Sequence, residues 1–374
     1  MEDKITFDEL YNAYFLCLKN KKRKIGTYTF ANDDLCMNLM ELMDELNEYR
    51  YVPKQSNCYV VTDPALREIY AAQFTDRIVQ HFYMNEINDI LETKLVKGCC
   101  SCRVGKGTDY ALGLLKKYLI ETSNKGKKDC YFLKIDLSGY FMSIDRKLIS
   151  RKFYELIIEN YKGKHKELLL YLTPIIFENN PSLNCFYKCN PTIRSMVPER
   201  RKMNPNSDYE MAIGNLTAQA GSNLNLNGFD HFVVEELKLP KYVRYVDDIV
   251  IISDSKEKLK ASLPKIISKL SETNQKLNLK KTRIDTAYHG VPFLGKVTYP
   301  YGYQKLKKST IIRIKYKAKK FENRRNLLAK LNSKIGALKK YNCRKLILNY
   351  YKDIKDRLPR YIEFDEKQMT FKQF

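Results

Sequence analysis

The chain has 374 residues and a formal net charge of +24, with 67 Lys and Arg against 43 Asp and Glu. An excess of this size points to a polyanionic partner, most often a nucleic acid. No apolar run approaches the roughly 18 residues that span a bilayer, and the acidic N-terminus is unlike a signal peptide. Ten cysteines do not make a disulfide framework in a chain of this length. We therefore expect reduced thiols in a cytoplasmic protein without a membrane partner.

The first half of the chain alternates between helical and extended patterns. Residues 1–50 have apolar positions at helical spacing, which predicts an N-terminal helical extension. Residues 51–62 are typical of a strand, and Arg67 leads a second strand, after which a helix is expected to about Leu95. Two glycines and a lysine between Arg103 and Thr108 precede a predicted helix over 109–122. This arrangement suits phosphate but lacks the P-loop spacing, so it is a weak motif alone.

The middle of the chain contains a lone aspartate at the end of a predicted strand. Residues 131–136 are largely apolar and finish at Asp136, which is followed by a glycine and two aromatic residues. Helices are predicted over 147–177. The next stretch, 179–208, has four prolines, many asparagines and a basic patch. It predicts an irregular, exposed insertion.

Two adjacent carboxylates, Asp247 and Asp248, lie between two short β-branched runs. This pattern predicts a hairpin with both carboxylates at its tip. Two negative charges at the edge of an apolar sheet are costly, and a hard divalent cation with oxygen ligands neutralises them. A solvated Asp-Asp turn is the alternative for this stretch alone. Farther on, residues 305–325 contain ten Lys or Arg and one acid, Glu322, in a helical pattern that continues to about Asp356.

Asp136 and the hairpin carboxylates suit two-metal phosphoryl transfer. That chemistry needs carboxylates on neighbouring strands holding two cations about 3.5–4 Å apart. Asp136 and Asp247 satisfy it if the strand over 131–136 lies beside the hairpin in an antiparallel sheet. Helices and strands arranged around such a hairpin predict an α+β fold.

The order of these motifs resembles that of reverse transcriptases. The Tyr-Val-Asp-Asp box follows a fingers motif with Arg67, a glycine-rich box and the box that begins at Asp136. The corresponding stretches are 66–80, 102–108, 136–141, 245–248, 277–282 and 293–295. The resemblance covers about residues 50 to 300. It implies a right-hand polymerase fold with fingers over 51–130, a palm over 131–304 that includes part of the fingers and the insertion, and a basic helical thumb over 305–374.

The fourth box suggests a subfamily. Most reverse transcriptases have Gln-Gly-x-x-x-Ser-Pro there, whereas this chain has Ile213-Gly214-Asn215-Leu216-Thr217-Ala218-Gln219. This sequence resembles the enzymes of diversity-generating retroelements. The resemblance implies copying of a template-repeat RNA with errors opposite template adenines, mutagenic retrohoming into a target gene, and a bacterial or phage-encoded protein. It also implies a small, basic, oligomeric accessory protein as a partner, beside template RNA, the RNA/cDNA duplex and deoxynucleoside triphosphates.

Residue roles follow from the same resemblance. Asp136, Asp247 and Asp248, with the Leu137 carbonyl, are expected to hold two Mg²⁺ ions. Lys281 is expected to give a proton to the leaving pyrophosphate, Arg67 to grip the triphosphate, and Phe141 to exclude a 2′-hydroxyl. An isoleucine at position 213 cannot hydrogen-bond as a glutamine does, so we hypothesise that it lowers fidelity. The expected nucleotide-binding residues are Arg67, Leu137, Phe141, Ile213, Gly214 and Gln219.

Two other functions compete with this one. The first alternative is a reverse transcriptase of another class, such as a group II intron, retron or phage-defence enzyme. An intron enzyme usually has a maturase extension and often a nuclease domain, and neither is recognisable here. A basic RNA-binding protein with a dead polymerase fold is the alternative of a different kind. The presence of Asp136, Asp247 and Asp248 argues against it.

Overall fold

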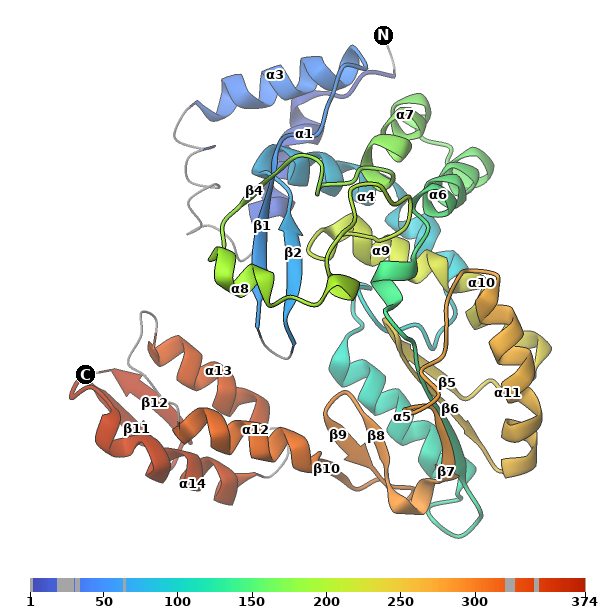
Figure 1. The fold of residues 1–374 in the computed structure, drawn as a ribbon, viewed down its shortest axis with the longest axis vertical. Helices are drawn as coiled ribbons and strands as arrows, with labels where there is room; N and C mark the ends of the chain where they lie inside the picture. The colour runs from blue at the N-terminus through green and yellow to red at the C-terminus, as the bar shows by residue number, and fades with distance from the viewer. Residues whose placement is uncertain are drawn as a thin grey trace. The chain divides into compact units, whose positions relative to one another are not determined.

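The computed structural model describes residues 3–18, Phe30, 34–62, 65–319, 327–339 and 343–373. These residues form two compact units (Figure 1). The first unit comprises Met1–Ala111, Leu133–Ile251 and Lys256–Ile284, and the second comprises Leu112–Phe132, Ile252–Ser255 and Asp285–Phe374. Within the described ranges, every helix is too short or too polar to cross a bilayer.

The described residues in the N-terminal part of the first unit form helices, whereas residues 19–29 and 31–33 of the predicted helical extension lie outside the described residues. Helix α1 packs against both α3 and α4. The Asn47 side chain holds the start of the chain, because it accepts a hydrogen bond from the Ile5 N–H at 2.8 Å and donates one to the Ile5 carbonyl at 3.0 Å. The helices are α1 (Phe7–Leu18), α3 (Leu35–Asn47) and α4 (Phe74–Lys94).

A three-stranded sheet follows, in the order β2-β1-β4. β1 (Ser56–Val61) pairs antiparallel with β2 (Arg67–Ala71) and parallel with β4 (Cys185–Tyr187). Strand β4 comes from the stretch 179–208, which the sequence predicts to be irregular. The prediction missed this strand because three residues carry no period-2 signal, and pairing with β1 orders them. The same stretch contains the short helices α8 (Pro191–Ser195) and η2 (Glu199–Arg201).

Buried Arg146 anchors the far end of this stretch. Its guanidinium donates hydrogen bonds to backbone carbonyls of Glu178, Ser207, Tyr209 and Glu210. Stacked rings of Phe153 and Phe177, 4.2 Å between centroids, pack two neighbouring helices together. The helices of this region are α5 (Thr108–Thr122), α6 (Arg146–Asn160), α7 (Lys166–Phe177), α9 (Leu216–Asn225), α10 (Asn227–His231), the π-helix η3 (Phe232–Glu236) and α11 (Lys256–Ser271).

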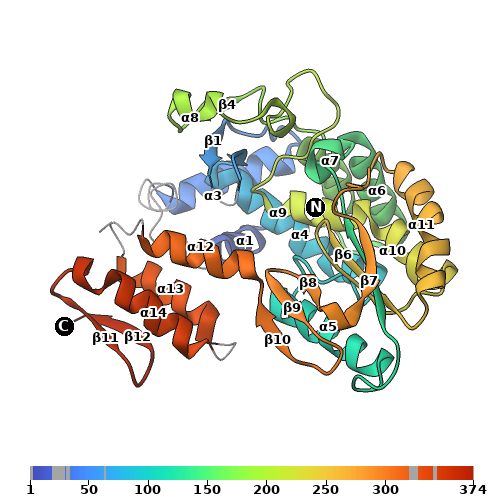
Figure 2. The ribbon, with the colours of Figure 1, turned by 60° about the horizontal axis from the view of Figure 1, so that its bottom comes forward.

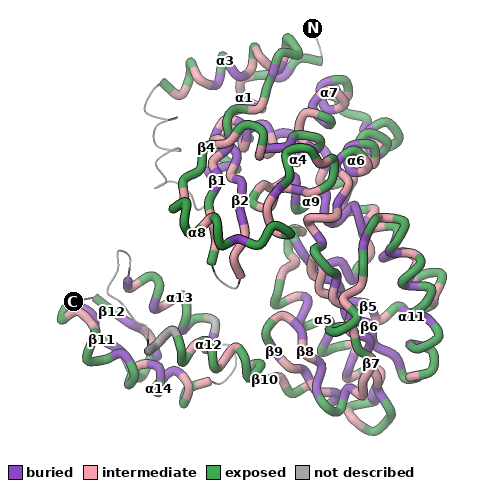
Figure 3. The backbone as a smooth tube through the Cα atoms, viewed as in Figure 1, coloured by how far each residue is buried: buried purple, intermediate pink, exposed green. Residues whose placement is uncertain are grey.

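A four-stranded sheet in the order β5-β6-β3-β7 carries the predicted hairpin. Strands β5 and β6 pair antiparallel, with Tyr245 opposite Asp248. Figure 3 shows an almost continuous buried run along these strands. Both faces of the hairpin are therefore covered, which explains its unbroken apolar sequence. The strands are β3 (Tyr131–Asp136), β5 (Tyr242–Tyr245), β6 (Asp248–Ser253) and β7 (Arg283–Thr286).

The second unit contains a small sheet, β10-β9-β8, and a separate helical cluster. Figure 2 shows α12, α13 and α14 grouped with the C-terminal hairpin β11–β12. The predicted helical run over 305–374 is thus only partly helical, because it begins in β10 and ends in a hairpin whose Phe364 and Phe371 enter the helical core. The elements are η4 (Ala287–His289), β8 (Val291–Phe293), β9 (Lys296–Thr298), β10 (Gln304–Leu306), α12 (Lys308–Lys319), α13 (Leu327–Lys339), α14 (Arg344–Ile354), η5 (Lys355–Arg357), β11 (Ile362–Asp365) and β12 (Thr370–Gln373).

Candidate active site

The carboxylates predicted to act together come from two neighbouring strands. Asp136 is the last residue of β3, Asp247 lies in the turn of the hairpin, and Asp248 is the first residue of β6. β6 lies next to β3 in the sheet, and the charges of both Asp136 and Asp248 act on Asp247, so the three carboxylates lie at the same end of the sheet. The condition named in the sequence analysis, that the strand over 131–136 lies beside the hairpin, is met.

Asp247 carries the electrostatic cost of this arrangement. Burial raises the pKa of its carboxyl group above the ordinary value, and the negative charges of Asp248 and Asp136 raise it further. Lys134 opposes the shift only in part. An ionised Asp247 is therefore stabilised by any cation that binds among these carboxylates.

Two lysines stand close to the other two carboxylates. Lys134 forms an ion pair with Asp248, and the Lys281 ammonium lies 3.4 Å from the Asp136 carboxylate. The Asn278 side-chain amide also donates a hydrogen bond to Asp136, at 3.1 Å. Lys281 lies beside Asp136 although 66% of its side chain is exposed, and its role as a proton donor stays a prediction.

The donor set fits a hard divalent cation in its chemistry, since it consists of carboxylate oxygens. Burial is the first cause of the raised pKa of Asp247, and a cation bound beside it would favour the ionised carboxylate. Within the described residues, no three His, Cys, Asp or Glu side chains form a cluster compact enough to hold a metal ion. In this structure, Lys281 supplies the positive charge next to Asp136, and Lys134 supplies it next to Asp248.

The sequence analysis did not predict the buried ion pair between Arg244 and Asp230. Arg244 of β5 and Asp230 of α10 are both fully buried, with 0% of either side chain exposed. Arg244 Nε donates to both Asp230 oxygens, at 2.8 and 3.1 Å, and the Tyr242 hydroxyl donates to the same carboxylate at 2.6 Å. Burial by itself lowers the pKa of Arg244, but the Asp230 carboxylate outweighs it, so that pKa lies well above its ordinary value. The sequence signal that could have revealed this pair is Arg244 itself, a charged residue within a short, otherwise uncharged strand.

This network fixes the turn that carries Asp247. Val246 has φ 58°, a left-handed conformation that is unfavourable for a β-branched residue. The Arg244 guanidinium donates to the Val246 carbonyl at 3.3 Å, and the Val246 N–H donates to the Ser101 hydroxyl at 3.1 Å. The strained turn is thus held from both sides by buried groups.

The predicted triphosphate ligand Arg67 leads β2, directly opposite Val61. Its Nε atom is buried and has no hydrogen-bond partner among the residues that the structure describes. A buried guanidinium donor without a partner is costly, and an anionic oxygen is the partner that suits it. This orphaned donor agrees with the predicted phosphate-binding role, which the structure does not test.

Ile213 and Gly214 are held against β2. The Tyr70 N–H donates to the Ile213 carbonyl at 3.2 Å, and the Ala72 N–H donates to the Asn215 side chain at 3.2 Å. A Cβ atom on Gly214 would lie 2.8 Å from the Tyr70 carbonyl oxygen, and its φ is 132°. Only glycine therefore allows this segment to approach the strand so closely.

The remaining predicted residues lie around the same segment. Phe141, half-buried, is in η1 (Tyr140–Ser143), and its carbonyl accepts a hydrogen bond from the Met211 N–H at 2.8 Å. This bond brings Phe141 near the start of residues 213–219, which are called the Ile213 segment below. Leu137 is buried and forms a backbone bridge with Leu277. Exposed Gln219 lines a groove with Cys102, Arg103 and Val104 of the glycine-rich box.

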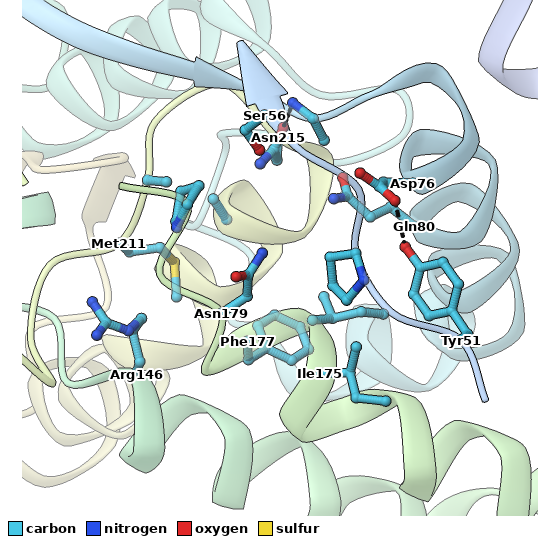
Figure 4. Close-up of a pocket in the computed structure, with 16 residues that line it drawn as sticks. Tyr51, Ser56, Asp76, Gln80, Arg146, Ile175, Phe177, Asn179, Met211 and Asn215 are labelled. Carbon is cyan, nitrogen blue, oxygen red and sulfur yellow. Dashed lines mark hydrogen bonds between the residues drawn. The ribbon is translucent and has the colours of Figure 1, made fainter. Parts of the chain in front are cut away.

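A separate pocket lies behind the Ile213 segment (Figure 4). It is lined by Met211 and Asn215 on one side and by Tyr51 and Asp76 on the other. The Tyr51 hydroxyl donates to Asp76 at 2.7 Å, and burial raises the pKa of that carboxyl group. None of the three hairpin-site carboxylates lines this pocket, so it supports the segment from behind and is separate from the candidate active site.

Comparison with known proteins bears on this site. Residues 211–298 match a family described as reverse transcriptase (RNA-dependent DNA polymerase). That range contains the fourth box, the whole hairpin and Lys281. Residues 211–298 are thus similar to a reverse transcriptase domain.

Solved structures agree on the fold of this domain. A telomerase from Candida albicans, in complex with the TWJ fragment of telomeric RNA, aligns over 82% of this chain and 54% of its own, with a TM-score of 0.50 and 13% identity. Apo telomerase from Candida tropicalis aligns over 82% of this chain and 58% of its own, with a TM-score of 0.51 and 11% identity. The chain spans little more than half the length of these proteins, and no curated protein sequence matches it. The predicted α+β polymerase fold is confirmed.

The buried ion pair between Arg244 and Asp230 gives a stability prediction. Asp230→Ala leaves the Arg244 guanidinium buried without its carboxylate, so the free energy of unfolding should fall by about 3–5 kcal/mol in urea denaturation. Asp208→Ala is the control, because its ion pair with Lys147 is 2.9 Å long but more than half exposed. The control should lose less than about 1 kcal/mol. Equal losses in the two variants would contradict the importance of the buried pair.

The raised pKa of Asp247 gives a pH prediction. A pKa that is higher in the folded than in the unfolded chain makes stability fall as pH rises from the unfolded value through the folded one. Asp247→Asn removes this penalty and should raise the Tm by roughly 2 °C at neutral pH, without added divalent cation. The gain should shrink as pH falls through the pKa of Asp247 toward that of the unfolded chain, because the wild-type carboxyl becomes protonated. Asp254→Asn, at an exposed carboxylate just past β6, should show no such gain. A gain independent of pH would refute the electrostatic explanation.

Proposed function

We propose that this protein is an RNA-directed DNA polymerase that makes cDNA from an RNA template. The observation that carries the proposal is the gathering of Asp136, Asp247 and Asp248 at one end of the hairpin sheet in a reverse transcriptase domain. The charge of +24 supports a nucleic-acid substrate. The substrates proposed with it are template RNA, the RNA/cDNA duplex and deoxynucleoside triphosphates.

The site residues divide into two groups in this proposal. Asp136, Asp247, Asp248 and the Leu137 carbonyl would hold Mg²⁺, which when bound activates the attacking hydroxyl and braces the leaving pyrophosphate. Lys281, beside Asp136, supplies a proton to the pyrophosphate side of the reaction. Lys134 neutralises Asp248 and so reduces the repulsion among the carboxylates.

The second group binds the nucleotide. The orphaned Nε of Arg67 supports a contact with the triphosphate, to which a guanidinium donates in a planar fork. Phe141, held by its backbone bond to Met211, excludes a 2′-hydroxyl from the sugar site. Gly214 and Gln219 flank the nucleotide from the Ile213 segment.

We infer further that the enzyme is of the diversity-generating retroelement class. The support is the Ile213-Gly214-Asn215-Leu216-Thr217-Ala218-Gln219 box, in which an aliphatic residue replaces glutamine. In this role the enzyme copies a template-repeat RNA with errors at adenines, for retrohoming that diversifies a target gene. A small, basic, oligomeric accessory protein and a bacterial or phage cytoplasm belong to the same proposal. Reverse transcriptases of intron, retron or defence type are the runner-up, distinguished by faithful copying of adenines.

The polymerase proposal predicts complete dependence on the carboxylates. Asp136→Ala and Asp247→Ala should each lower the rate of primer extension on RNA with Mg²⁺ by roughly 10³-fold or more, because charge stabilisation at the reacting phosphate is lost. Asp254→Ala is the matched control and should keep wild-type activity. Extension that survives Asp247→Ala would overturn the assignment of that residue.

Ile213 gives a prediction about fidelity. Ile213→Gln restores a side chain that can hydrogen-bond near the nucleotide, so sequencing of the cDNA should show adenine-directed errors reduced by roughly tenfold. Ala218→Ser restores the serine that is usual in the same box and should leave the error spectrum unchanged. An unaltered spectrum for Ile213→Gln would show that this position only packs.

A further inference from the structure

A mostly buried lysine lies inside the strand that ends at Asp136. Lys134 belongs to β3 and lies two residues before Asp136, so the two side chains leave the strand on the same face. Only 17% of the Lys134 side chain is exposed. A lysine with so little exposure is costly unless an anion accompanies it. The anion here is the carboxylate of Asp248, the first residue of the neighbouring strand β6.

The charge of Lys134 acts on more than one carboxylate. Its ammonium forms the ion pair with Asp248. Burial is the largest influence on the pKa of Asp247 and raises it, whereas the positive charge of Lys134 lowers it. Lys281 differs, because 66% of its side chain is exposed and solvent therefore screens its charge from Asp136. Of the two lysines beside the carboxylates, Lys134 is the counter-ion that solvent screens less.

An ammonium group and a divalent cation compete for the same carboxylate. Lys134 donates a hydrogen bond to Asp248 Oδ1, an oxygen that a hard metal ion would otherwise take as a ligand. The two positive charges also repel each other at short range, and this repulsion is strong where little solvent lies between them. A cation that binds all three carboxylates therefore has to displace Lys134 from Asp248.

We propose that Lys134 is a built-in competitor of the divalent cation for Asp248, and that it keeps the affinity of the nucleotide-free site for the metal low. The inference rests on the proposed polymerase function, in which Asp248 helps to hold Mg²⁺. Lys134 acts through Asp248 and touches no reacting atom, so it is a positioning residue. It stabilises the three gathered carboxylates before the metal binds, and it releases Asp248 when the metal arrives.

The test is equilibrium binding of Mn²⁺ to the full-length protein without nucleotide or RNA, followed by the electron paramagnetic resonance signal of free Mn²⁺. Mn²⁺ takes the same oxygen ligands as Mg²⁺, and its signal gives the bound fraction directly. Lys134→Met keeps most of the side-chain length and removes the charge, so it should tighten Mn²⁺ binding about tenfold. Lys134→Arg keeps the charge and should stay within about threefold of the wild-type affinity.

A double-mutant cycle shows whether the competition is for Asp248. In an Asp248→Asn background, Lys134→Met should tighten Mn²⁺ binding by less than about threefold, because no carboxylate remains at position 248 to be released. Equal tightening in both backgrounds would show that Lys134 acts only as a distant charge, and would overturn the proposal. Unchanged or weaker binding by folded Lys134→Met would overturn it too.

Controls define which Mn²⁺ ions are counted. Asp247→Ala should remove the ion that belongs to this site, and Mn²⁺ binding indifferent to that change in every variant would also contradict the proposal. Lys147→Met neutralises a lysine whose ion pair with Asp208 is more than half exposed, and it should keep the affinity within about twofold. Circular dichroism melting checks the folding of each variant. If Lys134→Met is unfolded, Lys134→Gln replaces it, with the same tightening expected.

The same samples separate this inference from the polymerase proposal. Primer extension by the wild-type protein tests the polymerase proposal alone. If the wild type extends no primer while Lys134→Met still tightens Mn²⁺ binding, the role of Lys134 stands and the polymerase function fails. If extension is normal and Mn²⁺ binding ignores Lys134→Met, the role of Lys134 fails and the polymerase function stands.

Discussion

The buried ion pair between Arg244 and Asp230 is the interaction on which the candidate site depends. It ties the first strand of the hairpin to a helix, and the guanidinium also reaches the carbonyl of Val246 in the turn. Taking both charges out of water is expensive, and a buried pair is seldom the most stable way to fill a core. Here it does something apolar residues cannot, because its fixed donors hold a β-branched residue in a left-handed turn. That turn determines where Asp247 lies.

The second constraint is the electrostatic cost of the three carboxylates. Burial raises the pKa of Asp247, and repulsion by Asp248 and Asp136 raises it further. Lys134 and Lys281 offset part of this cost by approaching Asp248 and Asp136. The site is therefore short of positive charge at Asp247 in particular. A site that binds cations and phosphates during its reaction gains affinity for both from such a deficit and from a partnerless arginine donor.

The sheet that contains Arg67 takes its third strand, β4, from the irregular stretch 179–208. The stretch 179–208 has the composition of an exposed loop, and most of it has little regular structure. Arg146 anchors its end, β4 pairs with β1, and Arg194 forms an ion pair with buried Glu68 of β2. These contacts convert the stretch into the third strand of a sheet.

Much of the site was open to prediction from local pattern. Asp247 and Asp248 lie between two buried β-branched runs, and Asp136 ends a third, so hydrophobic periodicity alone located the carboxylates at strand ends. The basic composition indicated the class of ligand, and the ordered boxes indicated the polymerase fold. What sequence could not supply were contacts between distant positions: the pairing of Arg244 with Asp230, the addition of β4 to β1, and the C-terminal hairpin within the helical core. Each depends on which surfaces meet after folding, since a three-residue strand or a buried arginine has no periodic signal of its own. The sequence by itself thus determined which carboxylates gather and at which strand ends. Only the tertiary structure decided how their turn is held and which lysine pairs with Asp248, because those outcomes arise from long-range pairing.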